Sequence, residues 1–193
     1  MSTLTVQNIQ GSSSSSNTIS VASGHVLNAP GHVVQLVEKQ DKTVASTSST
    51  SYTNSGVSGL NLSITPKFAT SKIYMTVHLS VEMTGANTGY IIFARNPAGT
   101  PVYFANTGES ANLGGAGESA DGVSKYFLTQ GYGGVNGGCT SHSGIDSPNT
   151  TSAVTYGILW ATNSGSAPAY YNRGVGSATY VTNSSISLME IAQ

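Results

Sequence analysis

The side chains that could bind a metal ion or act as a nucleophile lie mainly in one glycine-rich stretch. Cys139 and His142 are three residues apart there, and His25, His32 or Asp146 could complete a metal site with them. A zinc site takes three or four ligands, and the sequence holds no second ligand pair such as C-x-x-C or H-x₃-H. Nothing marks the third residue that would orient a Cys–His nucleophile. We therefore predict no metal and no cofactor.

Three carboxylates in another stretch, Glu109, Glu118 and Asp121, suggest a second kind of chemistry. Paired carboxylates cleave glycosidic bonds, and a glycan-cleaving tailspike-type enzyme would use such a pair. That enzyme usually needs a far larger β-helix than 193 residues provide. The G-x-S-x-G motif is absent, and the segment GGAGES lacks the G-K-[ST] ending of a phosphate loop. We predict that the protein is not an enzyme and keep glycan cleavage as a minor alternative.

Other histidines and tyrosines are candidates for contacts with partners. His25 and His32 each follow a glycine and could meet across a trimer axis or contact a partner from the arm. His78 lies on the polar face of a predicted strand, where it could touch a subunit. Tyrosine with Ser, Gly and Asn is typical of adaptable recognition surfaces. The candidate recognition-loop residues are Tyr103, Tyr126, Tyr132, Tyr170 and Tyr171.

Composition narrows the class of partner. Charged residues make up 8% of the chain and the formal net charge is −1, whereas an ordinary domain has about 25% charged residues. Without a basic field to neutralise phosphates, nucleic acid is not an expected partner. No stretch approaches the roughly 18 apolar residues of a spanning helix, so we expect no membrane insertion. A net charge near zero disfavours a free monomer and favours assembly.

The elements that must position these residues are β-strands. Residues 73–81 alternate strictly between apolar and polar positions, which predicts a half-buried strand with Tyr74, Thr76 and His78 on its polar face. Further strands are predicted over residues 33–37, 60–64, 90–95, 102–105, 123–129, 154–160, 169–172 and 185–191. We expect 169–172 to pair with 154–160, and the first and last strands to be neighbours. Residues 106–122 and 131–152 are predicted to be loops.

The spacing of these strands predicts the fold class. Nine or ten short strands over some 160 residues, with no window of helical period, indicate an all-β sandwich or barrel. Residues 1–32 carry few apolar side chains and are broken by Gly11, by a serine run and by Pro30 and Gly31. We predict an extended N-terminal attachment arm over residues 1–32 and a β-sandwich domain over residues 33–193.

Four segments, in order along the chain, carry a family resemblance. They are GHVVQLVEKQDKT, then STSSTSYTNSGVSGLNLSITPKFATSKIYMTVHLSV, then DSPNTTSAVTYGILWATNSGSAPAYYNR, and SSISLMEIAQ. Together they resemble a family of tailed-phage virion structural proteins of the tail-fibre type. The resemblance covers residues 31–193 and is weakest in the predicted loops 84–89, 106–122 and 131–145. Those loops are where a binding surface would vary.

The resemblance implies a fold and a place of action. It implies a single antiparallel, jelly-roll-like β-sandwich, similar to the heads of tumour necrosis factor and complement C1q, assembled as a homotrimer. It also implies a non-enzymatic phage virion protein. Because the N-terminus MSTLTVQNIQ lacks a signal peptide, we expect assembly in the host cytoplasm and final location in the virion.

Two functions remain open within that class. The chain could be a short tail fibre or appendage that presents loops to the host surface and there contacts a glycan. Alternatively, it could be a capsid decoration (cement) protein whose arm, residues 1–32, clamps capsid subunits. The expected partners are other copies of the chain and either a tail protein or the major capsid protein.

Overall fold

The computed structural model describes residues 22–23, 25–27, 29–85, 88–104, 126–130, 135–163, 165–174 and 177–193, and this part of the chain is almost entirely β-strand. No helix in those ranges is long and apolar enough to cross a membrane. The elements in these ranges are β1 (Val33–Asp41), β2 (Ala45–Thr47), the short 3₁₀ helix η2 (Ser58–Leu60), β3 (Leu62–Ile64), β4 (Lys72–Thr84), β5 (Thr88–Arg95), β6 (Val102–Phe104), β7 (Tyr126–Gln130), β8 (Val135–Asp146), β9 (Val154–Thr162), β10 (Ala169–Tyr171), β11 (Arg173–Gly174), β12 (Ser177–Val181) and β13 (Ser184–Ile191).

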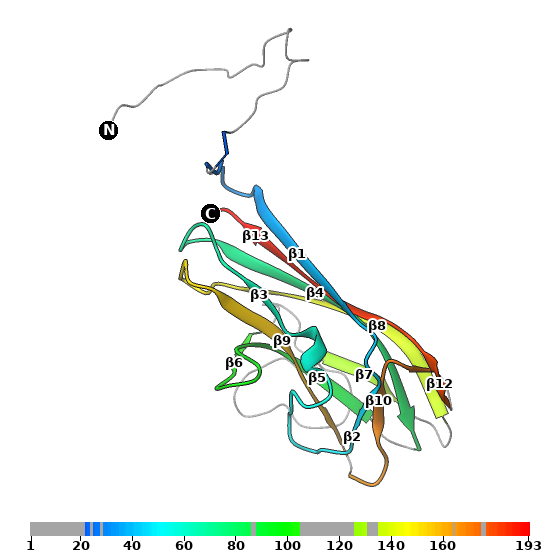
Figure 1. Cartoon of the computed structure of the whole chain (residues 1–193). Coiled ribbons are helices and arrows are strands. Elements are labelled where there is room, and N and C mark those ends of the chain that lie inside the picture. Colours follow the sequence, from blue (N-terminus) through cyan, green and yellow to red (C-terminus); the bar gives the residue numbers. More distant parts are fainter. Residues whose placement is uncertain are drawn as a thin grey trace, which may run out of the picture.

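The strands form two antiparallel sheets that face each other (Figure 1). The six-stranded sheet has the order β1-β13-β4-β10-β2, with β8 on the other edge of β4. The five-stranded sheet has the order β3-β9-β5-β6, with β7 also paired to β5. The short strands β11 and β12 pair only with each other within the described ranges. The all-β sandwich predicted from the strand spacing is therefore confirmed.

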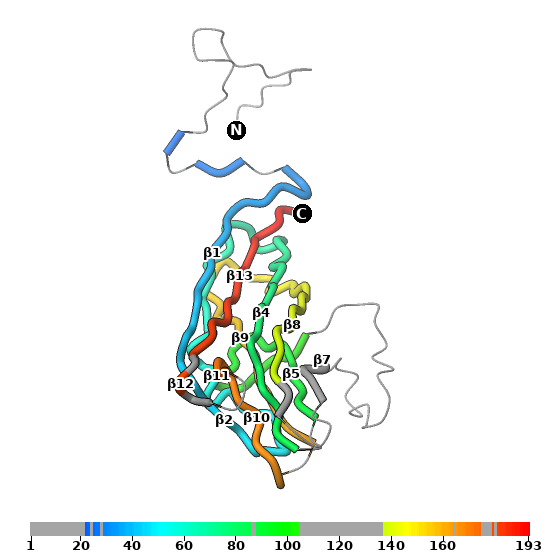
Figure 2. The backbone as a smooth tube through the Cα atoms, turned by 90° about the vertical axis from the view of Figure 1, so that its right-hand side faces the viewer, coloured from blue at the N-terminus to red at the C-terminus, as the bar shows by residue number. Residues whose placement is uncertain are grey.

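The two halves of the chain pair in a nested way. β1 pairs with β13, β3 with β9, β4 with β8 and β5 with β7, so the first strand meets the last and the innermost pair lies in the middle of the sequence. Figure 2 shows β1 and β13 side by side along one edge. The prediction that the first and last strands are neighbours is confirmed.

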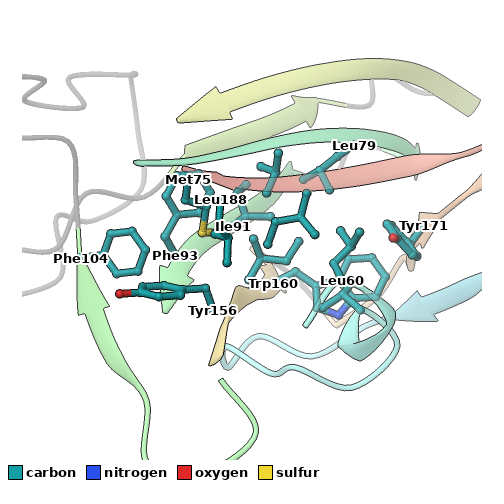
Figure 3. Close-up of a cluster of buried hydrophobic side chains, with 14 of the residues drawn as sticks. Leu60, Met75, Leu79, Ile91, Phe93, Phe104, Tyr156, Trp160, Tyr171 and Leu188 are labelled. Atoms are coloured by element: carbon teal, nitrogen blue, oxygen red, sulfur yellow. The ribbon is translucent and has the colours of Figure 1, made fainter. Parts of the chain in front are cut away.

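The core lies between the sheets and follows from the alternation in the strands. The apolar side of the predicted strand 73–81 is buried, while His78 on the other side is exposed. β9 contributes Tyr156, Ile158 and Trp160, all at most 1% exposed. Figure 3 shows Trp160 beside Leu60 and Tyr171 within this cluster. Burying these apolar side chains between the sheets is the main stabilising contribution in a sandwich. β5 and β9 are buried on both faces, with Ile92, Ala94 and Leu159 in a second, smaller cluster.

Two sequence-based predictions about pairing are wrong. Residues 135–146, predicted to be loop, form the long strand β8 along β4. Its Gly- and Ser-rich composition shows no alternation, but β4 offers a continuous edge that outweighs the weak strand propensity. Residues 169–171 pair with β2 and β4 rather than with β9. Both edges of β9 are already occupied, by β3 and β5.

A glycine in β8 is expected to be essential for packing. A Cβ added at Gly144 would lie 2.7 Å from Cδ2 of Phe93, whose ring is fully buried. We expect Gly144→Ala to lower the free energy of unfolding by about 1–3 kcal/mol, because an over-packed core must shift side chains or backbone. Gly138→Ala, in the same strand with nothing within 4 Å, is the matched control. Chemical denaturation of both variants tests this, and equal stabilities would contradict it.

Candidate functional site

The strand register gives the sandwich two ends that differ in structure. At one end, here called the arm end, the N–H of Gly31 donates to the carbonyl of Ala192 (2.8 Å), and the N–H of Ala192 donates to the carbonyl of His32 (2.9 Å). The chain therefore enters and leaves the sandwich at the same place. β4 begins there, since Lys72 lies opposite Ile191.

At the other end, here called the loop end, β4 and β9 end and β5 and β8 begin. Thr84 lies opposite Val135, and Gly89 lies opposite Thr162. This end gathers the β4–β5 connection, the connection that leads into β8 and the connection that follows β9, whereas the chain passes from β8 to β9 at the arm end. β4 has 13 residues, so the two ends are separated by about 40 Å at the usual rise of a strand.

A buried carboxylate holds the arm end together. Glu190 is 0% exposed. Its Oε1 accepts hydrogen bonds from the N–H of Lys67 (2.8 Å), the N–H of Phe68 (3.2 Å) and the hydroxyl of Ser71 (2.7 Å). Its Oε2 accepts one from the Gln35 amide (2.6 Å). One side chain of β13 therefore fixes the loop between β3 and β4 and the start of β1.

An irregularity at the start of β1 positions Gln35 against Glu190. The β1–β13 register is irregular between Val33 and Gln35, and such irregularities re-aim side chains. The Gln35 amide donates both to Glu190 and to the carbonyl of Thr65 (2.7 Å). Burial alone would raise the pKa of Glu190, but the hydrogen bonds from Ser71, Gln35 and the two backbone N–H groups outweigh it and lower that pKa below its ordinary value.

A second buried carboxylate lies near the loop end. Glu82 is 0% exposed, and its Oε1 lies 3.4 Å from Nη2 of Arg173. The Arg173 guanidinium also stacks on Tyr170, with Cζ 3.8 Å from the ring centroid. Because Arg173 belongs to β11, these contacts hold the β11 segment against β4. They are structural contacts, and they explain why Tyr170 is only partly exposed.

The five candidate recognition tyrosines do not form one surface. Tyr103 is 36% exposed on β6. Tyr171 is 1% exposed and packs edge-on against Trp160, with ring centroids 6.3 Å apart. Its assignment to a recognition loop is wrong, because its position in β10 turns it into the core. Tyr126 falls in β7, its side chain lies outside the described part, and Tyr132 lies outside it altogether.

The three candidate contact histidines are exposed but lie apart. His25 and His32 precede β1 at the arm end. His78 lies on the outer face of the six-stranded sheet, opposite Ser185, with its Nδ1 2.6 Å from the hydroxyl of Ser141. Seven residues along β13 separate Ser185 from the arm end, a distance of about 20 Å. Their roles at a trimer axis or an arm contact stay predictions.

The residues weighed for a metal site are separated by the strand they occupy. Cys139 lies opposite Ser80 and His142 opposite Val77, so the two side chains leave opposite faces of β8. Within the described ranges, no group of three or more His, Cys, Asp or Glu side chains could hold a metal ion. The carboxylates Glu109, Glu118 and Asp121 lie outside those ranges.

Asp146, also weighed as a ligand, is engaged in the fold. Its Oδ2 accepts a hydrogen bond from the hydroxyl of Tyr156 (2.8 Å) and lies 3.4 Å from Nε of Arg95. Sequence reasoning missed this role, and it also missed Glu190. The sequence did contain a signal for Glu190: it lies two residues after Leu188 and four after Ile186, on the side of the strand that these apolar residues bury. A charged residue at an inward position indicates a buried, hydrogen-bonded group.

Two buried phenols should make the protein sensitive to alkali. Burial, followed by the charge of Asp146, raises the pKa of Tyr156 far above its ordinary value of 10.0. Burial, followed by the charge of Asp41, does the same for Tyr171. Their contribution to stability is complete below about pH 10 and is lost as the pH rises above it, because only the unfolded chain ionises readily there.

Denaturant unfolding between about pH 8 and about pH 11 measures this loss. We expect a steep fall in stability above about pH 10, and a shallower one in Tyr156→Phe, which cannot ionise at that position. Stability that stays constant across this range would contradict the prediction.

Comparison with known proteins gives little further information. No protein-family model matches the chain, and no curated protein sequence matches it. Among solved structures, one match is described as "Structure of infectious bursal disease virus Gx strain", with 11% sequence identity and a TM-score of 0.29. The match covers 91% of this chain and 42% of that chain, so this chain spans less than half of its length.

Proposed function

We propose that the protein is a non-enzymatic structural protein of a tailed-phage particle, and that it is a short tail fibre or appendage. The arm end attaches it to the virion and the loop end faces the host. The observation that carries this proposal is the separation of the two ends by the length of β4. An appendage needs this polarity, because attachment and contact with the host must occur at different places.

The nested strand pairing supports the proposal. Two four-stranded orders, β1-β13-β4-β8 and β3-β9-β5-β7, can be traced through the sheets. We assign this arrangement to a jelly roll, the fold class that includes viral capsid and lectin domains. Fold class alone does not give function. The assignment gains weight from the four segments that resemble phage tail-fibre proteins.

The state of the buried carboxylates supports a non-enzymatic role. Glu190 and Glu82 are 0% exposed and Asp146 is 8% exposed. Each is paired or hydrogen-bonded to groups of the fold itself. A carboxylate that cleaves a glycan must reach its substrate, and these three are used to hold segments of the sandwich together.

One observation favours the alternative of a capsid decoration protein. Val26 and Leu27 are 41% and 53% exposed in the segment that leads to β1. Apolar side chains in an extended arm would be buried if that arm clamped capsid subunits. The arm, residues 1–32, is the attachment element in both functions, and the particle surface that it contacts distinguishes them.

Immunogold labelling of intact particles distinguishes these functions. An antibody against the sandwich should label the tail end if the protein is a fibre or appendage. Label spread over the head would replace the fibre with the decoration function. Absence of label from particles that are shown to package the gene would refute the proposal of a virion protein.

Removing the arm tests the attachment end. We expect a chain lacking residues 1–28 to keep its sandwich, since the turn from Ala29 to His32 and the pairing of residues 31–32 with Ala192 are retained. The truncated chain should fail to join particles. Co-sedimentation with particles measures attachment, and an unchanged unfolding midpoint controls for folding. Full occupancy by the truncated chain would show that the arm is not the anchor.

A further inference from the structure

Four apolar side chains form one continuous row across the outer face of the six-stranded sheet. Leu36 lies opposite Met189, Met189 opposite Tyr74, and Tyr74 opposite Ile145. Their neighbours Ile73 and Leu188 point into the core, so all four point outwards. Figure 2 shows the four strands concerned, β1, β13, β4 and β8, side by side. We call these four residues the apolar row.

The apolar row is exposed where a solvated sheet face would be polar. Leu36 is 55% exposed and Ile145 41% exposed, and Tyr74 and Met189 are partly exposed. The next two register rows on the same face are polar, as expected for a face in water. They are Glu38, Ser187, Thr76 and Ser143, and then Gln40, Ser185, His78 and Ser141. A contiguous apolar patch bordered by polar residues is typical of an interaction site.

Charge indicates the chemistry of the partner. Among the twelve residues of the three rows, Glu38 is the one that is charged at neutral pH. A strongly charged partner would lose hydration here without gaining an opposite charge. The complementary surface is therefore neutral and hydroxyl-rich. This chain has such a surface itself, with 8% charged residues and 30 serines.

We infer that the apolar row is the contact between copies of this chain. It reaches both edges of the face, with Leu36 on β1 and Ile145 on β8, so a neighbouring copy can contact it from either side. The inference rests on the homo-oligomer predicted from the sequence and names the surface that mediates it. The three rows carry one charge, Glu38, and Lys72, of opposite sign, lies in the neighbouring row on the arm side. Two copies can therefore approach without strong like-charge repulsion.

The dimensions of the face predict a reversible contact. Four strands and three rows cover about 15 Å by about 13 Å, which is well below the roughly 800 Å² per partner of a stable interface. Exposed Val33 at the start of β1 could extend the face towards the arm. We therefore expect an oligomer that dissociates on dilution.

Sedimentation velocity of the full chain over a wide concentration range tests the inference. The wild type should form an oligomer, and the double variant Leu36→Ser/Ile145→Ser should weaken association by at least about tenfold, because it removes two apolar side chains from the contact. Val102→Ser is the matched control, since Val102 is 47% exposed on β6 in the other sheet. It should associate like the wild type.

A second variant keeps the test valid if the double variant fails to fold. Thr76→Glu keeps the apolar row intact but adds a carboxylate beside it, and it should also weaken association. A wild type that stays monomeric at the highest concentration would overturn the inference. So would oligomers that neither the double variant nor Thr76→Glu weakens. These outcomes are independent of immunogold labelling, so the inference and the proposed function can fail separately.

Discussion

Trp160→Ala is expected to lower the free energy of unfolding by about 3–5 kcal/mol, the usual cost of truncating a large aromatic core residue. The indole is 1% exposed and packs edge-on against Tyr171. Its Nε1–H donates to the carbonyl of Ser55 (2.8 Å), and its backbone forms a bridge with Thr53. The substitution would leave a cavity beside the segment between β2 and β3 and remove the hydrogen bond that holds this segment.

Chemical denaturation followed by circular dichroism measures the loss, since Trp160 is the only tryptophan and its fluorescence disappears with it. Trp160→Phe separates packing from hydrogen bonding. It keeps much of the ring volume, and its cost should be clearly smaller than that of alanine. A loss below about 1 kcal/mol for Trp160→Ala would contradict the central position of this side chain in the core.

Glu190→Ala is expected to have a comparable effect, a loss of about 3–5 kcal/mol. The substitution removes the acceptor for the N–H groups of Lys67 and Phe68 and for the side chains of Ser71 and Gln35. A buried donor without an acceptor costs about 1–3 kcal/mol. The loop between β3 and β4 and the base of β1 should loosen first, and amide hydrogen exchange of residues 31–36 and 65–71 measures this directly.

The same carboxylate predicts sensitivity to acid. Because the folded-state pKa of Glu190 lies below its ordinary value of 4.5, its contribution to stability is complete above about pH 4.5. That contribution is lost as the pH falls through the lower folded-state value. Glu190→Gln cannot titrate at this position, so its stability should fall less steeply with acid than that of the wild type. Parallel acid profiles for the two proteins would contradict the assignment.

Strands with one buried face could be predicted from the sequence with nearly correct limits. The alternation over residues 73–81 corresponds to β4, because a strand that buries one face repeats every two residues. The predicted last strand, residues 185–191, corresponds to β13. β8 could not be predicted in this way. Its residues follow no such pattern, and it is a strand because the edge of β4 pairs with it over its full length.

The candidate site could be predicted less well than the fold. Residue type alone placed Tyr171 among the recognition residues, but its direction depends on the pairing of β10 with β2 and β4. Cys139 and His142 are close in the sequence, yet the pleat of β8 separates them. Glu190 carried a signal, since it occupies an inward-facing position, but its partners come from residues more than a hundred positions away.

The sequence by itself determined the all-β class, the neutral hydroxyl-rich surface and the approximate position of most strands, since these depend on composition and on a period of two residues. Only the tertiary structure decided the nested pairing, the two ends of the sandwich and the apolar row. The apolar row joins Leu36, Tyr74, Ile145 and Met189 through the register of four strands. Which strands pair depends on which edges are free once the sheets assemble, and the pattern within a single strand does not encode that choice.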